Sequence, residues 1–274
     1  GVFADGVLYD CNLCTERSDV TVHRIKLTVA YDGTNYCGWQ VQPGDPSVQQ
    51  AVQQALSTLL RHETVVVGAG RTDTGVHASF YVAHFDAERA VDDPARFCYH
   101  LNAVLPDDIA VSALRRVRDD AHARFDAVQR EYKYYVALRK DPFRRDTAFR
   151  YALPLDAERM NEAAALLIGC GDFTSFAKLH SNNRTNVCRV DRARWDREDD
   201  LLVFTIAADR FLRNMVRAIV GTLLDVGRGK MSPEDMRAVI DGRSRSLSGC
   251  SAPAHGLFLT DVKYPDGIYV DTTN

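Results

Sequence analysis

The sequence has no long apolar run. Although 46% of its 274 residues are hydrophobic, uninterrupted apolar stretches such as 163–168 are short. A transmembrane helix needs about 20 such residues, so no membrane span is expected. The first residues also lack a basic region followed by an apolar stretch, which predicts no secretory signal. We therefore expect a cytoplasmic protein.

The cysteines do not form a disulfide framework. There are seven of them, an odd number, scattered between residues 11 and 250. This distribution is typical of reduced thiols in a cytosolic protein. Cys11 and Cys14 form one Cys-x-x-Cys pair without a second pair or a nearby histidine, so we predict no zinc site.

Known cofactor motifs are missing from the most glycine-rich loop. Its glycines at 68, 70 and 75 match neither the dinucleotide fingerprint nor the P-loop, so no nucleotide cofactor is expected. The tripeptide Asp73-Thr74-Gly75 also occurs in aspartic proteases. That chemistry needs two carboxylates sharing a proton. No second Asp-Thr-Gly or Asp-Ser-Gly is present, so a protease would have to gain its partner by dimerising.

The same loop contains the best candidate for catalysis. Asp73 lies in Gly68-Ala-Gly-Arg-Thr-Asp-Thr-Gly-Val-His-Ala78, directly after the β-branched run 64–67, with Arg71 and His77 nearby. A loop at a strand end holds a carboxylate on fixed backbone and leaves it open to a ligand. The alternative is a structural turn in which Asp73 caps backbone amides. The loop alone leaves both interpretations open.

Charge is uneven along the chain. The net charge is −3, yet residues 115–150 contain eleven Lys and Arg against six Asp and Glu, interleaved with aromatic residues. Basic and aromatic side chains together suit phosphate contacts and base stacking. A solvated strand pair with its aromatics in the core explains the same composition equally well.

Periodicity predicts an α+β protein of two similar α/β halves, 23–118 and 119–274, preceded by an unassigned extension at 1–22. In both halves strands alternate with helices in a similar order, and a ligand cleft is expected between the halves. The predicted strands are 23–31, 64–68, 78–85, 109–118, 130–138, 187–195, 201–208 and 256–264. The predicted helices are 48–60 after Ser47, 94–104, 156–168, 212–226 and one starting at Ser232-Pro233.

Two side chains outside the loop deserve a functional interpretation. Arg217 is flanked by apolar residues in the predicted helix at 212–226, one turn after Arg213. A cation in such surroundings is costly unless it is paired, and Asp73 would be a natural partner. Tyr132 shares a strand face with Tyr134, and that face is either core or part of a site.

Taken in order, these segments resemble the tRNA pseudouridine synthase A family (TruA-type) over about residues 24–265. Each motif alone is weak, but their order and spacing are highly specific. The matching motifs are Tyr31-Asp-Gly-Thr34, Gly38-Trp-Gln40, Gly70-Arg-Thr-Asp-Thr-Gly-Val-His-Ala78, Asn102 with Leu105-Pro106, His122-Ala-Arg-Phe125, Arg130-Glu-Tyr-Lys-Tyr134, Asp172-Phe-Thr-Ser-Phe176, Phe211-Leu-Arg-Asn-Met-Val-Arg217 and Gly256-Leu-Phe-Leu259.

The resemblance implies the pseudouridine synthase fold, a continuous and mostly antiparallel sheet with helices on one side and a central catalytic cleft. It implies conversion of uridine to pseudouridine at positions 38, 39 and 40 in the anticodon stem-loop of tRNA. No cofactor or metal is implied, and the enzyme is expected to be a homodimer. A non-catalytic RNA-binding protein on the same scaffold is the closest alternative.

The resemblance also assigns roles to residues. Asp73 matches the catalytic aspartate, and Arg217 matches its ion-pair partner. Arg71 matches the arginine that fills the gap left by the displaced base, a gap that arises because a paired uridine must be flipped out before it can react. Tyr132 matches the tyrosine that contacts the uracil, and Leu257 an apolar residue that lines the pocket.

Two basic residues of the first predicted strand, Arg24 and Lys26, are also expected to bind RNA. Glu131 departs from the family pattern, because a basic or neutral residue is common there. This acidic side chain could alter the contacts beside Tyr132.

Overall fold

The computed structural model describes residues 21–270. Cys11, Cys14 and almost all of the extension predicted at 1–22 lie outside this range, as do residues 271–274. Within 21–270 no helix combines the length and the apolar character needed to cross a membrane.

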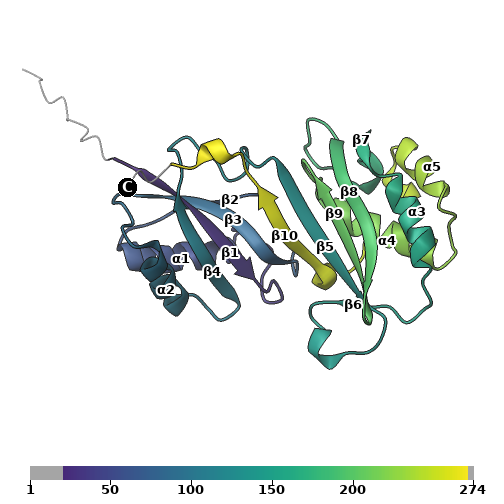
Figure 1. Cartoon of the computed structure of the whole chain (residues 1–274), viewed down its shortest axis with the longest axis horizontal. Coiled ribbons are helices and arrows are strands. Elements are labelled where there is room, and N and C mark those ends of the chain that lie inside the picture. Colours follow the sequence, from purple (N-terminus) through teal and green to yellow (C-terminus); the bar gives the residue numbers. More distant parts are fainter. Residues whose placement is uncertain (1–20, 271–274) are drawn as a thin grey trace, which may run out of the picture.

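Ten strands form one mixed, mostly antiparallel sheet (Figure 1). Its main path is β4-β1-β3-β10-β5-β9-β8-β7, with β2 paired to β3 and β6 paired to β5. The strands are β1 His23–Tyr31, β2 Val66–Gly68, β3 His77–Ala87, β4 Ile109–Arg116, β5 Gln129–Ala137, β6 Phe149–Arg150, β7 Gly169–Asp172, β8 Val187–Glu198, β9 Leu201–Ala208 and β10 Leu257–Lys263.

Five α-helices accompany this sheet in residues 21–270. They are α1 Val48–Leu60, α2 Pro94–Val104, α3 Ala157–Ala165, α4 Met215–Gly227 and α5 Asp235–Asp241. A capping side chain confirms the predicted start of three of them. Ser47 caps α1 by accepting a hydrogen bond from the Gln50 amide, Asp93 caps α2 by accepting one from the Arg96 amide, and Asp156 caps α3 by accepting one from the Arg159 amide.

Helix α4 begins three residues later than its apolar pattern predicts. Asn214 has a left-handed backbone, with φ +67°, and therefore ends the preceding segment before the helix starts at Met215. The apolar pattern continues back to Leu212 because this residue is buried in the core around α4, although it lies outside the helix. Arg213 consequently precedes the helix that contains Arg217.

Strand β10 joins the two halves into one sheet. Although it comes from the end of the second half, it lies between β3 of the first half and β5 of the second. In Figure 1 it occupies the middle of the molecule, with α1 and α2 toward one end and α3, α4 and α5 toward the other. Its Leu259 belongs to the core around α1 and α2, whereas its Leu257 belongs to the core around α4. The halves predicted at 23–118 and 119–274 thus share a strand.

The helices cover one face of the sheet. Residues paired directly across a ladder lie on the same face, and such pairs link Ala78, Leu259, Tyr132 and Ile206 across β3, β10, β5 and β9. Ala78 belongs to the core that contains α1, and Ile206 to the core that contains α4. Tyr132 packs against both cores. The predicted fold class is therefore confirmed, and β10 and β5 lie between the two helical groups.

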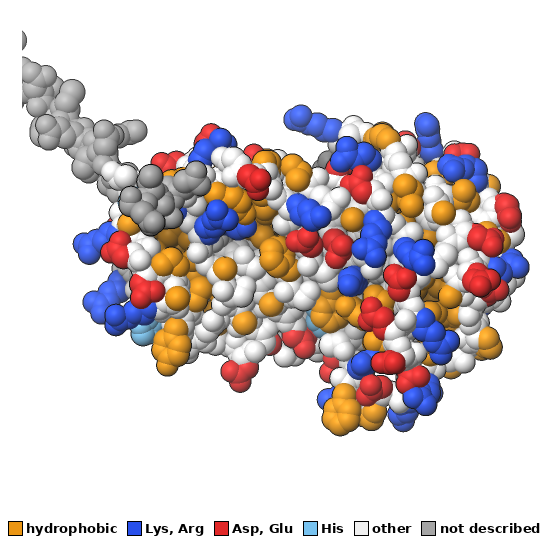
Figure 2. All heavy atoms as spheres, in the orientation of Figure 1, with side chains coloured by type: hydrophobic (Ala, Val, Ile, Leu, Met, Phe, Trp, Pro, Cys, Tyr) orange, Lys and Arg blue, Asp and Glu red, His pale blue; other side chains and the backbone are white. Residues whose placement is uncertain are grey.

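Many basic side chains in the stretch at 115–150 already have acidic partners within the protein. Five of its eleven Lys and Arg residues form ion pairs with aspartates, namely Arg116, Arg118, Arg139, Arg144 and Arg145. On the face drawn in Figure 2, basic and acidic side chains are likewise interspersed over the second half. On this face (Figure 2) the excess of positive charge in the sequence is therefore interrupted by acidic side chains.

Candidate active site

The Asp73 loop is fixed by an aromatic cluster from the first half. Trp39 stacks on Tyr81 with ring centroids 4.1 Å apart, and the Tyr81 hydroxyl donates to the Gly70 carbonyl at 2.6 Å. The Thr72 hydroxyl lies 2.9 Å from the Tyr31 hydroxyl. Gly38 makes this packing possible because its φ is +84° and a Cβ atom there would lie 2.1 Å from the Thr72 carbonyl oxygen.

The Asp73 carboxylate faces two arginines. Its Oδ2 accepts a hydrogen bond from Arg217 Nη1 at 3.1 Å, and its Oδ1 lies 3.9 Å from Arg213 Nε. The predicted ion pair between Asp73 and Arg217 is therefore present. Within residues 21–270 the carboxylate accepts no backbone amide hydrogen bond, unlike the carboxylate of a structural turn. It remains 26% exposed and thus accessible to a ligand.

Arg217 is held in place from a second direction. Its Nε donates to the Ala252 carbonyl at 2.8 Å, while the Ala252 amide donates to the Arg217 carbonyl at 2.9 Å. Because Arg217 lies in the first turn of α4, the helix fixes its backbone. The hydrogen bond of Nε thus positions the guanidinium. Its Nη1 donates to Asp73, which lies 144 residues away in sequence.

Tyr132 lies on the helical face of β5, between the two cores. Its ring meets the ring of Phe211 edge-on, with centroids 5.0 Å apart. Burial raises the pKa of Tyr132 to about 12, and the nearby Asp73 carboxylate adds to the shift. The hydroxyl therefore stays protonated at neutral pH and can donate a hydrogen bond.

Leu257 and Arg71 have contrasting surroundings. Leu257 is buried at the start of β10, on the same face as Tyr132 and next to it in the ladder, where it pairs with Tyr134. Arg71 is exposed on the Asp73 loop, two residues before the carboxylate. The proposed roles of these two residues stay predictions.

His77 is a structural residue despite its place in the motif. It is fully buried, and its Nδ1 accepts a hydrogen bond from the Gly33 amide at 2.8 Å. Its Nε2 therefore carries the proton and donates to the Asp146 carbonyl at 2.7 Å. Asp32 lies 3.2 Å from Nδ1, an atom that already accepts the hydrogen bond from the Gly33 amide.

Arg24 and Lys26 are engaged away from Asp73. Arg24 makes a bidentate ion pair with Asp86, at 2.8 and 2.9 Å, and donates to the Ala121 carbonyl. The Lys26 ammonium donates to the Tyr269 hydroxyl and lies 4.8 Å from the centre of that ring. Arg24 and Lys26 therefore use donors in intramolecular hydrogen bonds that RNA binding would also need. Their expected RNA contacts stay predictions.

Glu131 points to the opposite face of β5 from Tyr132, because side chains alternate along a strand. Its carboxylate accepts a hydrogen bond from the Thr260 hydroxyl at 2.8 Å. The unusual acidic residue thus has a partner of its own.

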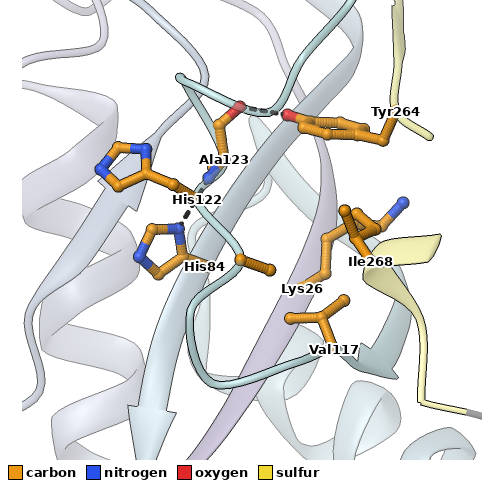
Figure 3. A pocket seen from close by; sticks show the side chains of 8 residues that line it. Lys26, His84, Val117, His122, Ala123, Tyr264 and Ile268 are labelled. Atoms are coloured by element: carbon orange, nitrogen blue, oxygen red, sulfur yellow. Dashed lines mark hydrogen bonds between the residues drawn. The ribbon is translucent and has the colours of Figure 1, made fainter.

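A small cavity lies between Lys26, His84 and Tyr264 (Figure 3). Its volume is about 10 Å³, which is room for about one water molecule and far too little for a nucleobase. His84 borders it and accepts a hydrogen bond from the Ala123 amide. Burial, followed by the charge of Arg24, lowers the pKa of His84 from 6.5 to about 4.

This shift predicts a loss of stability in mild acid. Between pH 6.5 and 4 the unfolded chain takes up a proton at His84 that the folded chain does not, so the free energy of unfolding falls as the pH is lowered. The full shift corresponds to about 3 kcal/mol. Urea unfolding of His84→Gln against pH should show a flatter acid limb than the wild type. The exposed control His100→Gln should keep the wild-type slope, and an unchanged slope in His84→Gln would contradict the assignment.

Sequence reasoning did not single out Phe211 and Arg130. Phe211 packs against Tyr132, as described above, and Arg130 donates hydrogen bonds to four backbone carbonyls. A signal for Arg130 was present in the alternation of β5, which puts this cation on the same face as Tyr132 and Tyr134. A cation on a core face requires partners.

Known proteins are similar to this chain over most of its length. Residues 27–126 and 163–265 match the family described as tRNA pseudouridine synthase. The tRNA pseudouridine synthase A of Bacteroides fragilis is 53% identical over 251 residues, which cover 91% of this chain and 100% of that protein. The enzyme of the same name from Bacillus subtilis is 43% identical, covering 88% of this chain and 99% of that protein.

The family match and these relatives thus define an isomerase that acts on tRNA. This chain is a member of the tRNA pseudouridine synthase family.

Proposed function

We propose that this protein converts uridine to pseudouridine at positions 38, 39 and 40 in the anticodon stem-loop of tRNA. The observation that carries the proposal is the Asp73 carboxylate, paired with Arg217 at 3.1 Å and partly open to solvent. Names of the curated relatives support tRNA as the substrate. The choice of positions follows from the resemblance between their family and this sequence.

The reaction exchanges one glycosidic bond for another. The N1–C1′ bond of uridine breaks, the uracil turns, and C5 bonds to C1′. C5 then loses its proton and N1 takes up a proton, so that the product is an isomer of the substrate. An ionised Asp73 acts as nucleophile or base in this exchange, and the guanidinium of Arg217 stabilises the ionised carboxylate. The uracil must remain in a dry pocket while it is detached. Leu257 and Tyr132 supply apolar surface for that pocket.

Exposed cations around Asp73 suit an RNA ligand. Arg71 and Arg213 are both exposed and flank the carboxylate in sequence and in space, respectively. Guanidinium groups bind phosphates and stack on bases, and this suits Arg71 to fill the place of a flipped nucleotide. We further propose that the enzyme works as a homodimer in the cytoplasm, so that one tRNA contacts both subunits.

The deciding experiment maps pseudouridine in unmodified tRNA transcripts after incubation with the protein. Product at positions 38, 39 or 40, and its absence with Asp73→Asn, is the expected result. Product elsewhere in the tRNA would keep the isomerase and overturn the positions. RNA binding without any product would instead favour a non-catalytic RNA-binding protein.

Tyr132→Phe is expected to lower turnover about tenfold or more and to change the dissociation constant for tRNA less than about twofold. The reason is that the hydroxyl is proposed to act at the base, whereas the ring would still line the pocket. Single-turnover rates and filter binding measure the two effects separately. An equal fall in affinity would give the hydroxyl a binding role. Tyr135→Phe, on the opposite face of β5, is the matched control and should behave as the wild type.

A further inference from the structure

Arg130 donates hydrogen bonds to four backbone carbonyls. Nη1 reaches the Ala127 and Asp209 carbonyls at 3.2 and 2.9 Å. Nη2 reaches the Ala69 and Arg124 carbonyls at 3.3 and 2.8 Å. No carboxylate forms an ion pair with Arg130 in the part of the chain that the structure describes, so its hydrogen-bonding capacity goes to the backbone.

Two of these carbonyls lie at the base of the segments that form the site. Ala69 comes two residues before Arg71 and four before Asp73. Asp209 follows β9 and begins the segment that leads through Phe211 and Arg213 into α4 and Arg217. One guanidinium therefore touches the start of the segment that carries Asp73 and the start of the segment that carries both of its arginine partners.

Arg130 itself lies on the strand that contributes the third element of the site. It precedes Tyr132 by two residues on β5, so both side chains lie on the same face. The Asp73 loop and the segment 209–214 are consequently both hydrogen-bonded to a residue two positions before Tyr132.

The remaining two carbonyls anchor Arg130 to a rigid turn, residues 121–127. The Ala123 amide donates to His84 Nδ1 at 3.0 Å, and the Tyr264 hydroxyl donates to the Ala123 carbonyl (Figure 3). Within the turn, the His122 amide donates to the Asp126 carboxylate at 2.6 Å. Because this turn is fixed to the sheet, the guanidinium bound to it has a fixed position too.

The donor set is specific to arginine. A buried cation is costly unless hydrogen bonds replace its lost hydration, and burial lowers the pKa of Arg130. A guanidinium has five donors in a rigid planar fork, so it can serve carbonyls on several sides at once. A lysine has one ammonium on a flexible stem and cannot span the same four oxygens.

We propose that Arg130 is a positioning residue, which holds the Asp73 loop and the segment leading to Arg213 and Arg217 in register beside Tyr132. It does not touch the substrate. This inference rests on the proposed catalytic role of Asp73, because it concerns the geometry of the Asp73–Arg217 pair.

The test compares Arg130→Lys with a matched control, Arg116→Lys. Arg116 also donates to two backbone carbonyls, those of Arg24 and Val117, but on β4 at the outer edge of the sheet. We expect Arg130→Lys to lower kcat about tenfold or more with KM for tRNA changed less than twofold, since small misplacements of reacting groups are costly. Arg116→Lys should lose a similar amount of thermal stability without losing kcat. Equal stability losses with unchanged kcat in both variants would overturn the proposal.

A double-mutant cycle with Arg217→Lys distinguishes positioning of the Asp73–Arg217 pair from a general loss of stability. If Arg130 acts through the Asp73–Arg217 pair, Arg130→Lys should cost less than about twofold in kcat once that pair is already perturbed. Independent, multiplying effects would overturn the inference. Assays are made well below the melting temperature of each variant, confirmed by thermal unfolding. If the Arg130 inference fails, the wild type should still form pseudouridine and Asp73→Asn should still form none. This outcome is therefore distinguishable from failure of the proposed function.

Discussion

Replacing Asp73 by Asn is expected to abolish pseudouridine formation and to leave tRNA binding almost unchanged. The amide has the shape of the carboxylate but neither its charge nor its basicity, so it cannot act as nucleophile or base. A loss of about a hundred- to ten-thousand-fold or more in single-turnover rate is the expected scale for such a group. The side chain is partly exposed, and the loop around it is fixed by Trp39 and Tyr81. The substitution should therefore not unfold the protein.

The matched control for Asp73→Asn is Asp86→Asn. Asp86 also pairs with an arginine, Arg24, but it lies on β3 away from the Asp73 loop. Its loss removes an ion pair of the same kind without removing the proposed chemistry. Wild-type rates of product formation in Asp73→Asn would end the catalytic assignment. Equal losses in both variants would point to a general effect of losing an arginine–aspartate pair.

Arg217→Ala is expected to be inactive as well, for a different reason. The variant removes the partner that Asp73 meets at 3.1 Å and also the hydrogen bond to the Ala252 carbonyl. Asp73 would keep only Arg213, at 3.9 Å. We expect kcat to fall about a hundredfold or more, because the carboxylate loses both its counter-charge and its orientation.

The same variant should also be less stable. Removing one partner of a fully buried ion pair costs about 3–5 kcal/mol, but this pair keeps 22% and 26% exposure and is partly screened by water. A loss of about 1–2 kcal/mol is therefore expected, measured by urea unfolding. Arg213→Ala, at an exposed and more distant position, should lose less of both activity and stability. Wild-type activity in Arg217→Ala would rule out a role for the ion pair.

The local elements of this protein could be predicted because they depend on neighbouring residues. Helix α2 was predicted at its observed bounds from Asp93 and Pro94, and β1 from alternation alone. The short edge strand β7, Gly169–Asp172, was missed because its two glycines give no strand pattern. The predicted start of helix α4 is three residues too early, because the apolar pattern does not reveal the left-handed backbone of Asn214.

Within the site, the sequence predicted a contact only where a charged side chain among apolar residues required a partner. Arg217 lay among apolar residues, so its pairing with Asp73 could be expected and is present in the structure. Arg24 and Lys26 looked equally available for RNA, but their partners Asp86 and Tyr269 lie 62 and 243 residues away in sequence. No local pattern reveals such partners.

By itself, then, the sequence determined the family, most of the elements and the candidate role of the loop around Asp73. Those depend on residue types, short-range periodicity and motif order. Only the tertiary structure decided that β10 joins the halves between β3 and β5, that His77 is a buried hydrogen-bonding residue, and that Arg130 connects the segments of the site. These features arise from contacts between distant segments, and such contacts exist only once the sheet has assembled and brought those segments within hydrogen-bonding distance.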